Sequence, residues 1–446
     1  MNLIGIDIGT TTISLVLIEK ETGKLIAKDT ITHESFLSGE IPEMKIQEPE
    51  KILSVTLEKL GEWMELYGRP AGIGFTGQMH GMLYVDKDGN AVSPFYTWQD
   101  ECGNLPLQNG KSSVEMLKEA ANNSGTLASG YGIVTHYYLK NMGCVPENGI
   151  KMSTISDYII MKLCGKKEPV IGMDMAASWG GFDLKKKEFC VSSLEAAGVA
   201  VSYLPEVKKN SGIVAETIQI GKIPAKIPVS ISIGDNQASF LGAVGLHKEA
   251  VLVNIGTGSQ VSYVSEKYVD CSGNIELRPY GDNRYLLVGA SLCGGRAYAM
   301  LEKFYREVSG TKDTDYYEVM EKQAKDFLEH YGISEAWNVR TTFSGTRTNP
   351  KERGQITNIG VENFHPGAFT VGVMKGIIEE LFCKYQVMSQ LTGKKAKHLI
   401  GAGNGMRKNK LMQKLTEDMF ELPMELSNSQ EEAACGAAYF LSGLLV

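Results

Sequence analysis

The sequence predicts an α/β protein built from two related lobes. Residues 3–18 and 251–264 each indicate two apolar β-strands joined by a glycine-containing turn. In both halves a further strand, an amphipathic helix and another strand follow in a related order, which indicates an internal duplication. The length of 446 residues fits two large domains. We therefore expect domains at residues 1–225 and 226–446.

The first half contains the clearer element pattern. Residues 3–7, 13–18 and 25–27 predict a meander of three strands, with a turn at residues 21–24. Pro49 opens a helical pattern that ends near Gly68, and residues 71–75 form another short strand. The middle of the chain, from 112 to 209, is expected to be helical and loop-rich. Its clearest helix covers residues 157–163, and we interpret residues 218–233 as a crossover between the domains.

The second half repeats this pattern. The expected strands are residues 251–255, 261–264, 286–288 and 398–401. The expected helices are residues 297–308 and 374–388, the second of which Gly393 ends. The repetition of strands, helix and strand supports the duplication.

Composition excludes several classes of protein. Lys and Arg total 45 against 52 Asp and Glu, so the formal net charge is −7. Without a basic patch or tail, nucleic acid and an anionic membrane are not the expected partners. Hydrophobic residues make up 43%, which excludes a globally disordered chain. The 49 glycines show no Gly-X-Y period, so they belong to turns and close backbone approaches rather than to collagen.

The chain start, the cysteines and the histidines indicate a cytoplasmic protein without a structural metal. The first residues lack a basic segment and include Asp7, which is atypical of a signal peptide. No uncharged apolar run approaches the roughly 18 residues of a membrane span. The eight cysteines are widely spaced with no C-x-x-C pair, which favours reduced thiols. The seven histidines show no metal-binding spacing either.

Two glycine-rich turns occupy matching places in the two halves. Residues 7–12, Asp-Ile-Gly-Thr-Thr-Thr, direct backbone N–H groups and hydroxyls toward one point, which suits phosphate oxygens. Asp7 at this edge could hold Mg²⁺ through water. Residues 256–259, Gly-Thr-Gly-Ser, form a second turn of the same kind. Either turn alone could be an ordinary hairpin, but the pair predicts a nucleotide clamp and favours ATP.

Two further segments join a strand to a helix. Residues 401–405, Gly-Ala-Gly-Asn-Gly, could let a flat base lie on the backbone, although such turns usually only connect elements. Residues 234–237, Gly-Asp-Asn-Gln, place Asp235 where it could simply cap a helix. Because the other motifs accompany it, we interpret Asp235 as a general base for an attacking hydroxyl.

The segments at residues 76–81 and 97–100 combine amides, an imidazole, a carboxylate and an indole. These are the groups that bind a polyol through hydrogen bonds and ring contacts. A single histidine is more often structural, but His80 lies between glycines with polar neighbours. We therefore favour a sugar contact for His80.

Together these motifs resemble the FGGY family of carbohydrate kinases, which belongs to the actin-like ATPase superfamily. The resemblance covers nearly the whole chain. Residues 7–11 look like the family's first phosphate motif and residues 256–258 like its second, while Asp235 falls where the family keeps its catalytic base. Other matching segments are residues 344–347, 353–354, 401–405 and 432–438.

The resemblance implies two actin-like (ribonuclease H-like) ATPase domains with a cleft between them. The first would hold the sugar site and the first phosphate loop. The second would hold the catalytic aspartate, the second phosphate loop and the adenosine site. ATP and Mg²⁺ are the implied cofactors, and a small-molecule sugar and ATP the implied partners. We expect a monomer or a homodimer.

The resemblance also implies roles for individual residues. Asp235 would be the catalytic base, and Asp7 and Asp235 would hold the metal. The sugar contacts would be Gln78, Met79, His80, Trp98, Asp100 and Asn236. The nucleotide contacts would be Gly9, Thr10, Thr11, Thr12, Gly256, Thr257, Gly258, Gly294, Gly401, Gly403 and Asn404.

Within the family, residues 97–102, 157–165 and 176–180 resemble the members that act on sedoheptulose. The expected product is sedoheptulose 7-phosphate. A kinase for xylulose or for another ketose or polyol is the alternative within the class. Outside this class, the alternatives are an actin-like ATPase without a sugar substrate and a sugar-sensing pseudo-kinase. The chain departs from the family pattern at His136, Thr346 and Asn409.

Overall fold

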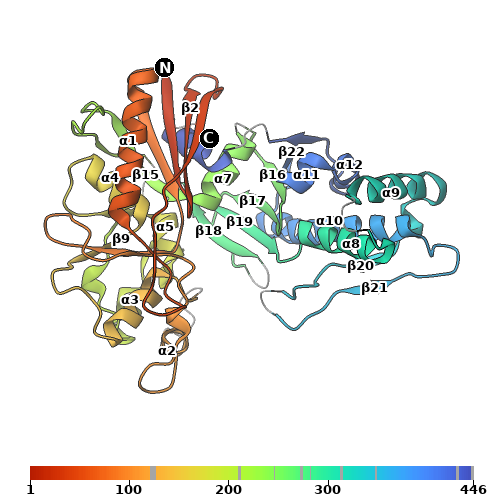
Figure 1. Cartoon of the computed structure of the whole chain (residues 1–446), viewed down its shortest axis with the longest axis horizontal. Helices are drawn as coiled ribbons and strands as arrows, with labels where there is room; N and C mark the ends of the chain where they lie inside the picture. The colour runs from red at the N-terminus through yellow and green to blue at the C-terminus, as the bar shows by residue number, and fades with distance from the viewer. Residues whose placement is uncertain are drawn as a thin grey trace. The chain divides into compact units, whose positions relative to one another are not determined.

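The computed structural model describes residues 1–120, 127–208, 212–245, 247–271, 275–281, 283–311, 315–346, 349–427 and 431–442 (Figure 1). The chain forms two compact units. Unit 1 is Met1–Leu246, Pro279–Asn283 and Ser429–Val446, and unit 2 is His247–Arg278 and Arg284–Asn428. The boundary expected at 225/226 would assign β15 (Pro228–Gly234) and α7 (Asp235–Val244) to the second domain, whereas by contacts both belong to unit 1.

Unit 1 is built on a six-stranded sheet with the order β14-β15-β6-β1-β2-β3. β1, β2 and β3 form an antiparallel meander, while β6 and β15 add in parallel on the other side of β1. A parallel neighbour requires a crossover, and α1 (Pro49–Tyr67) lies between β3 and β6 in the chain. The other strands are β1 (Asn2–Ile8), β2 (Thr12–Glu19), β3 (Leu25–Thr32), β6 (Gly72–Gly77) and β14 (Ile213–Glu216).

Unit 2 repeats this topology in a second six-stranded sheet, ordered β18-β19-β17-β16-β22-β23. β16, β17 and β19 are antiparallel neighbours, and β22 and β23 continue in parallel beyond β16. The order β19-β17-β16-β22-β23 therefore corresponds to β3-β2-β1-β6-β15, which confirms the predicted duplication. The strands are β16 (Ala250–Ile255), β17 (Ser259–Ser265), β18 (Glu276–Tyr280), β19 (Arg284–Ser291), β22 (His398–Ala402) and β23 (Met424–Leu426).

Helices complete both units. The predicted helix at 157–163 is α4 (Ile155–Leu163), and that at 374–388 lies within α10 (Pro366–Thr392), which Gly393 ends in a left-handed conformation. The others are α2 (Ser113–Ala120), α3 (Gly132–Asn141), α5 (Met173–Ser178), α6 (Val191–Ala196), α8 (Gly295–Ser309), α9 (Tyr317–Tyr331), α11 (Asn404–Lys408), α12 (Lys410–Phe420) and α13 (Glu432–Leu441). None of the helices within the described residues is long and apolar enough to cross a membrane.

Short strands also lie in the segments between the main strands and helices. They pair in small sheets of two or three strands outside the two main sheets. They are β4 (Phe36–Leu37), β5 (Ile46–Gln47), β7 (Leu83–Val85), β8 (Phe95–Tyr96), β9 (Lys151–Ser153), β10 (Val170–Gly172), β11 (Phe182–Asp183), β12 (Glu188–Phe189), β13 (Glu206–Lys208), β20 (Asn338–Arg340) and β21 (Gln355–Thr357).

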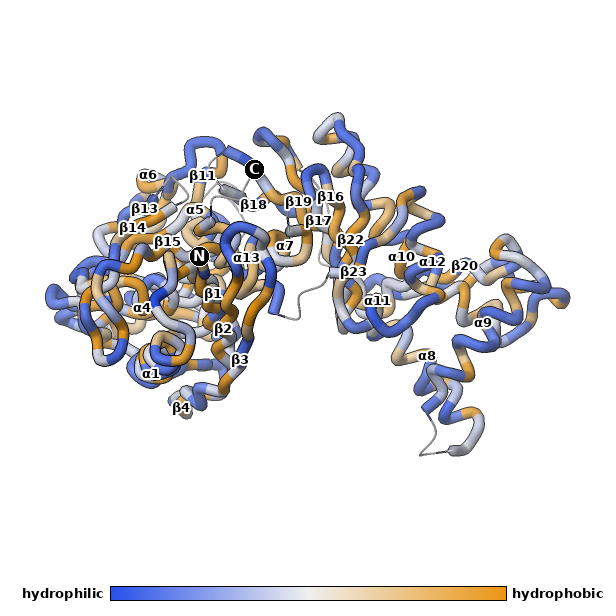
Figure 2. Tube along the Cα trace, turned by 90° about the horizontal axis from the view of Figure 1, so that it is seen from above, coloured by the Kyte–Doolittle hydropathy of each residue, from blue (hydrophilic) through white to orange (hydrophobic). Residues whose placement is uncertain are grey.

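The central strands of unit 1 are buried on both faces. Ile4 and Ile6 of β1 pack in one core cluster with Ile52 of α1, while Leu3 packs in a separate cluster with Ala434 of α13. Figure 2 shows β1 and β2 as largely hydrophobic along their length. Helices on both faces explain why these strands are almost continuously apolar rather than alternating.

Helix α13 approaches the sheet through glycines. A Cβ atom on Gly5 of β1 would overlap the carbonyl oxygen of Ala434, and one on Gly74 of β6 would overlap that of Ala437. Gly242 of α7 meets the backbone of α13 in the same way. The backbones therefore touch directly, with no room for side chains between them.

Replacing Gly74 with alanine tests this packing. The added methyl group has no space, so we expect Gly74→Ala to lower the free energy of unfolding by about 1–3 kcal/mol. Thermal unfolding measures the loss. Gly360→Ala is the matched control, because the nearest heavy atom to its Cβ would be Oδ1 of Asn363 at 3.7 Å. Equal melting temperatures for both variants would contradict the close packing.

Candidate active site

The turn between β1 and β2 in unit 1 is held by side chains from distant segments. The N–H of Gly9 donates to the carbonyl of Thr12 at 2.9 Å, which closes the turn. Nε2 of Gln47 donates to the carbonyl of Thr10 at 2.6 Å, and Nε2 of His33 lies 3.2 Å from the carbonyl of Gly9. The sequence analysis missed Gln47 and His33, because nothing in their spacing connects them to the turn.

Two predicted sugar contacts also reach this turn. Nε1 of Trp98 donates to Oγ1 of Thr10 at 3.0 Å, although the Trp98 side chain is half-exposed. The N–H of Gln78 donates to the carbonyl of Ile8 at 2.9 Å, and its amide Nε2 donates to Oε1 of Gln47 at 3.0 Å. Thr11 is exposed at the tip. The structure therefore brings Gln78, Trp98 and the turn together.

Asp100 is buried and holds its own loop. Its carboxylate accepts the N–H of Lys45 at 3.2 Å and the N–H of Cys102 at 3.1 Å, and burial raises its pKa. Asp100 also lines a hollow of about 870 Å³, together with Trp98 and Ser129.

His80 is held in an uncommon backbone conformation. Its φ angle is 73°, a region that residues other than glycine rarely adopt. Its N–H donates to Oγ of Ser178 at 3.1 Å, and Nδ1 lies 2.6 Å from the carbonyl of Ser178. A carbonyl can only accept, so Nδ1 carries a proton, and in the neutral form of the ring Nε2 would be the acceptor. The ring stacks on Tyr131 with centroids 4.3 Å apart.

The neighbouring Trp179 supports the same loop. Its buried Nε1 donates to the carbonyl of Gly81 at 3.0 Å. Ser178 and Trp179 thus give a physical reason for the segment at residues 176–180, which the sequence resemblance had marked without explaining.

Asp235 is the first residue of α7, directly after β15. Nδ2 of Asn236 donates to its Oδ1 at 2.9 Å, which orients the carboxylate. Asp174 of α5 accepts the N–H of Gly234 at 2.6 Å and so fixes the start of α7. A Cβ on Gly234 would lie 2.8 Å from Sδ of Met79, so Met79 packs against this junction. The sequence analysis missed Asp174.

Burial and neighbouring charges raise the pKa of two carboxyl groups in this region, Asp7 and Asp174. Burial, with the charges of Asp235 and Glu431, raises the pKa of Asp7 to about 7. Burial raises that of Asp174 to about 6, to which Asp235 also contributes. Carboxylate oxygens are the ligands that Mg²⁺ prefers, and a divalent cation would relieve this repulsion. Asp7 and Asp235 therefore fit Mg²⁺ chemically.

The effect of burial on the pKa of a carboxyl group can be tested at Asp157, which lies outside the predicted site. It is buried in α4, where the hydroxyl of Thr154 donates to Oδ2 at 2.7 Å. Burial raises the pKa of Asp157 from 3.8 to about 8, although the Thr154 hydrogen bond lowers it. The folded state therefore holds a proton that the unfolded state releases. Its stabilising contribution is complete below pH 4 and is lost as the pH rises towards 8.

We expect Asp157→Asn, which mimics the neutral form, to lose less stability than the wild type between pH 5 and pH 8. Urea unfolding at both pH values measures the difference. Asp88→Asn, at an exposed carboxylate paired with Lys167, is the control and should follow the wild type. Parallel pH profiles for the wild type and Asp157→Asn would show that Asp157 ionises normally.

Unit 2 contains its own cluster of glycine turns. The N–H of Gly256 donates to the carbonyl of Gly258 at 2.9 Å, and the N–H of Gly295 donates to the carbonyl of Gly256 at 2.9 Å. A Cβ on Gly294 would lie 2.7 Å from the carbonyl oxygen of Gly258. Thr257, exposed at the tip, accepts the N–H of Arg296 at 2.9 Å. The turn thus joins the start of α8.

Gly403 reaches the same turn from β22. It has a φ angle of 83°, and a Cβ there would lie 2.5 Å from the carbonyl oxygen of Ile255. Asn404 follows as an exposed residue at the start of α11. Gly401, by contrast, is buried within β22, where a Cβ would lie 2.6 Å from Sδ of Met424. Within residues 401–404, Gly403 and Asn404 therefore lie at the end of the sheet that carries the turn at residues 256–259.

The residues at which the chain departs from the family pattern lie in ordinary structural positions. Oδ1 of Asn409 accepts the N–H of Met412 at 2.9 Å and caps α12. His136 is buried, 2.6 Å from the hydroxyl of Tyr84, and burial lowers its pKa to about 4. Oγ1 of Thr346 accepts the N–H of Asn349 at 3.0 Å. Arg347, which the resemblance included, lies outside the described residues.

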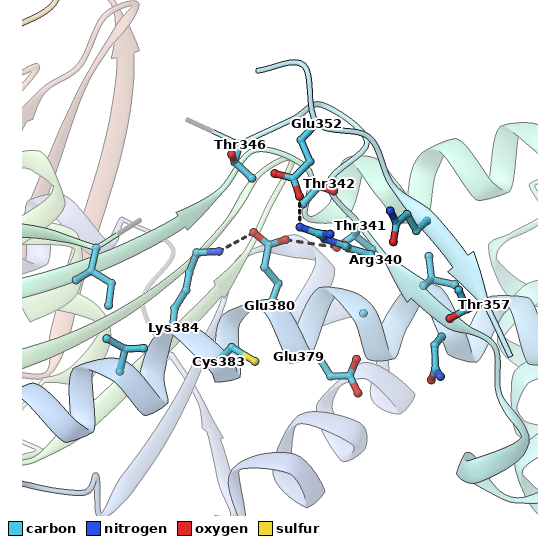
Figure 3. A pocket seen from close by; sticks show the side chains of 16 residues that line it. Arg340, Thr341, Thr342, Thr346, Glu352, Thr357, Glu379, Glu380, Cys383 and Lys384 are labelled. Carbon is cyan, nitrogen blue, oxygen red and sulfur yellow. Dashed lines mark hydrogen bonds and ion pairs between the residues drawn. The ribbon is translucent and has the colours of Figure 1, made fainter. Parts of the chain in front are cut away.

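A cavity of about 600 Å³ in unit 2 lies beside α10, β20 and β21 (Figure 3). Thr346 is among its lining residues, and the glycine turns are not. Inside it, Oε1 of Glu380 pairs with Lys384 at 2.6 Å, and Oε2 accepts the hydroxyl of Ser291 at 2.8 Å. Glu380 thereby fixes the end of β19, three residues before Gly294.

A duplicated sheet topology, glycine turns in both units and an aspartate at the start of a helix are the features expected of a phosphotransferase of the actin-like class. Comparison with known proteins identifies the family. The N-terminal domain of the FGGY family of carbohydrate kinases matches residues 2–242, and its C-terminal domain matches residues 251–442. The chain belongs to this family and is an ATP-dependent sugar kinase.

Named relatives span nearly the whole chain. Sedoheptulokinase of Mus musculus is 27% identical, over 98% of this chain and 96% of the relative. Xylulose kinase of Lactococcus lactis is 25% identical, over 99% of this chain and 88% of the relative. Both are similar enough to support the reaction class, and neither establishes the sugar.

Solved structures share the fold. Xylulose kinase of Rhodospirillum rubrum superimposes with a TM-score of 0.83 at 18% identity, covering 99% of this chain and 89% of that one. Glycerol kinase of Plasmodium falciparum, solved with ADP, gives a TM-score of 0.79 at 18% identity, covering 100% and 89%. These likenesses confirm the predicted two-domain kinase fold.

Proposed function

We propose that this chain transfers the γ-phosphoryl group of ATP to a terminal primary hydroxyl of sedoheptulose and forms sedoheptulose 7-phosphate. The observation that carries the proposal is the position of Asp235 in unit 1. Asp235 is the first residue of α7, and this end of the helix lies next to Met79. Met79 belongs to the loop that also contains Gln78 and His80. The similarity to sedoheptulokinase over 98% of the chain supports the choice of sugar.

Asp235 would act as the general base. As the hydroxyl oxygen attacks the γ-phosphorus, the hydroxyl proton passes to the Asp235 carboxylate. The bond between the γ-phosphorus and the β–γ bridging oxygen breaks, and ADP leaves. Asn236 holds the carboxylate through Oδ1, and Asp174 positions it through the N–H of Gly234. In such reactions positioning and charge neutralisation supply most of the catalysis.

The nucleotide contacts are proposed for the glycine turns. In unit 1 these are Gly9, Thr10, Thr11 and Thr12, and in unit 2 they are Gly256, Thr257, Gly258, Gly294, Gly401, Gly403 and Asn404. Asp7 and Asp235 would hold Mg²⁺, which neutralises phosphate charge when it is bound. Backbone N–H groups in such turns are suited to phosphate oxygens.

The sugar contacts are proposed for Gln78, Met79, His80, Trp98, Asp100 and Asn236. Nε2 of His80 is an acceptor for a sugar hydroxyl, because Nδ1 is committed to Ser178. The half-exposed Trp98 offers an apolar face that can cover the carbon skeleton. The cytoplasmic location and the monomeric or homodimeric state stay predictions.

A xylulose kinase is the second candidate, supported by the relative from Lactococcus lactis. An actin-like ATPase that uses no sugar agrees less well with the sequence, because the family match covers both domains of a carbohydrate kinase.

Asp235→Asn tests the proposed reaction. The amide keeps the shape of the side chain but cannot accept the proton, so kcat for sedoheptulose should fall by about 10²–10⁴. Nucleotide affinity measured without Mg²⁺ should change little, because Asp235 is proposed to contact the metal and the sugar hydroxyl rather than the phosphates themselves. A coupled assay of ADP release measures kcat, and fluorescence titration measures nucleotide binding.

Asp315→Asn is the control for this experiment, because Asp315 is an exposed residue of unit 2 whose Oδ1 accepts the N–H of Tyr317. It should behave as the wild type. An Asp235→Asn enzyme with near-wild-type turnover would remove Asp235 from the role of base. A wild-type enzyme whose ADP release sedoheptulose does not stimulate would refute the proposed substrate.

A further inference from the structure

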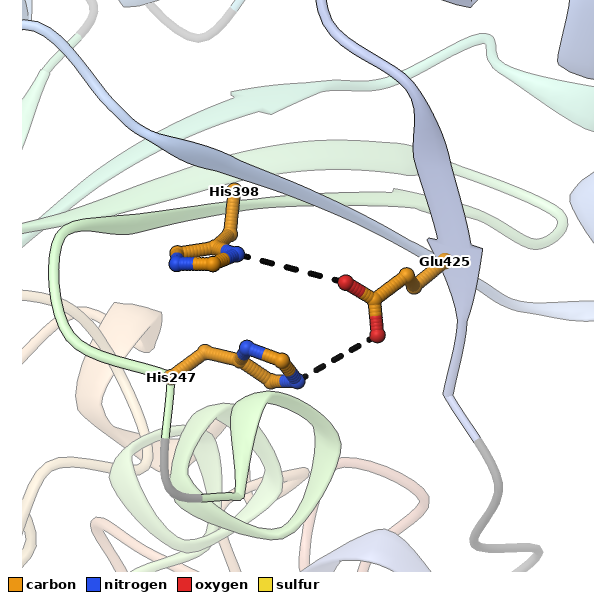
Figure 4. Close-up of side chains that lie close together, drawn as sticks. All are labelled: His247, His398 and Glu425. Carbon is orange, nitrogen blue, oxygen red and sulfur yellow. Dashed lines mark ion pairs between the residues drawn. The ribbon is translucent and has the colours of Figure 1, made fainter.

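Three side chains meet at one end of the unit 2 sheet, as Figure 4 shows. Nε2 of His247 lies 3.3 Å from Oε2 of Glu425, and Nδ1 of His398 lies 3.9 Å from Oε1 of the same carboxylate. The two imidazole rings are 4.6 Å apart. We propose that His247, His398 and Glu425 form a binding site for a first-row transition metal ion, with Zn²⁺ as its natural occupant.

The sheet topology creates this site from residues far apart in sequence. His247 leads into β16, His398 begins β22 and Glu425 lies in β23, and these are three adjacent strands. His398 pairs with Ala250, and Glu425 pairs with Ile400. Backbone hydrogen bonds of the sheet therefore hold two of the ligands, which lowers the entropy that metal binding must overcome.

The geometry is close to what zinc requires. One ligand atom from each residue can be chosen so that all three lie within 4.8 Å of one another. Ligand atoms on a tetrahedral zinc ion with bonds of about 2.1 Å lie about 3.4 Å apart. The His247–Glu425 distance already meets this value. The side chains are 37%, 40% and 58% exposed, so they have room to close by rotation and to leave a fourth position for water.

The donor set selects the class of metal. Two imidazoles and one carboxylate suit Zn²⁺ and its transition-metal neighbours, whereas Mg²⁺ prefers oxygen ligands alone. Two nearby lysines contact a different carboxylate. Lys397 pairs with Glu249 at 2.5 Å, and Lys394 lies 3.9 Å from the same carboxylate. Among the described residues, the Glu425 carboxylate lies within ion-pair distance of the two histidines alone.

The site is separate from the glycine turns of unit 2. Both β16 and β22 begin near the histidines and end at the turns, at Gly256 and Gly403. At about 3.3 Å per residue, the five residues of β22 span about 16 Å. Zinc at this position would clamp three parallel strands from the end opposite to the turns.

Zinc titration of the whole protein, stripped with EDTA and competed against a chromogenic indicator, tests the proposal. We expect one zinc ion per chain and at least a tenfold loss of affinity in His398→Ala and in Glu425→Gln. His330→Ala is the matched control, because His330 is an exposed histidine of α9 outside the cluster. Circular dichroism checks that each variant is folded.

Cobalt in place of zinc identifies the ligands independently of affinity. The eight cysteines are free, and two of them, Cys144 and Cys383, are exposed and could bind zinc instead. Nitrogen and oxygen ligands should give visible cobalt bands without thiolate charge transfer. A thiolate band, or equal zinc affinity of the wild type and His398→Ala, would overturn the proposal.

Discussion

The contact that the rest of unit 1 depends on is the backbone-to-backbone packing of α13. Gly5 of β1, Gly74 of β6 and Gly242 of α7 all meet the backbone of this one helix. Asp7 lies two residues after Gly5, Gln78 lies four residues after Gly74, and α7 begins with Asp235. Helix α13 thus fixes the relative positions of β1, β6 and α7, which carry or lead into the proposed sugar and metal contacts.

The same packing has an electrostatic consequence. β1 and α7, which both pack on α13, carry Asp7 and Asp235. Burial, together with the charge of Asp235, raises the pKa of Asp7 and that of Asp174 in α5. An arrangement that only stabilised the fold would avoid such repulsion. Perturbed carboxylates are typical of sites that bind a cation or move a proton. A sugar kinase needs both functions at one place, which agrees with the roles proposed for Asp7 and Asp235.

The sequence predicted the duplication because strand periodicity and glycine turns are local signals. The family resemblance assigned Gly256, Gly294 and Gly403 to the nucleotide contacts, and in the structure these glycines lie around one turn. The sequence could not identify the glycines that pack α13, since nothing local distinguishes Gly5 from a glycine in a turn. Asp174 and Gln47 were missed for the same reason, because only tertiary contacts bring them to the site. His247, His398 and Glu425 carry no spacing signal, and only adjacent strands bring them together.

The choice of sugar is most directly tested by comparing kcat/KM for sedoheptulose and for D-xylulose, with glycerol as a third acceptor, in one coupled assay of ADP release. A sugar pocket built from Gln78, His80 and Trp98 for a seven-carbon ketose should give the highest kcat/KM with sedoheptulose. The product should carry its phosphate on the terminal carbon. A higher kcat/KM for D-xylulose, or ADP release that no sugar stimulates, would contradict the account.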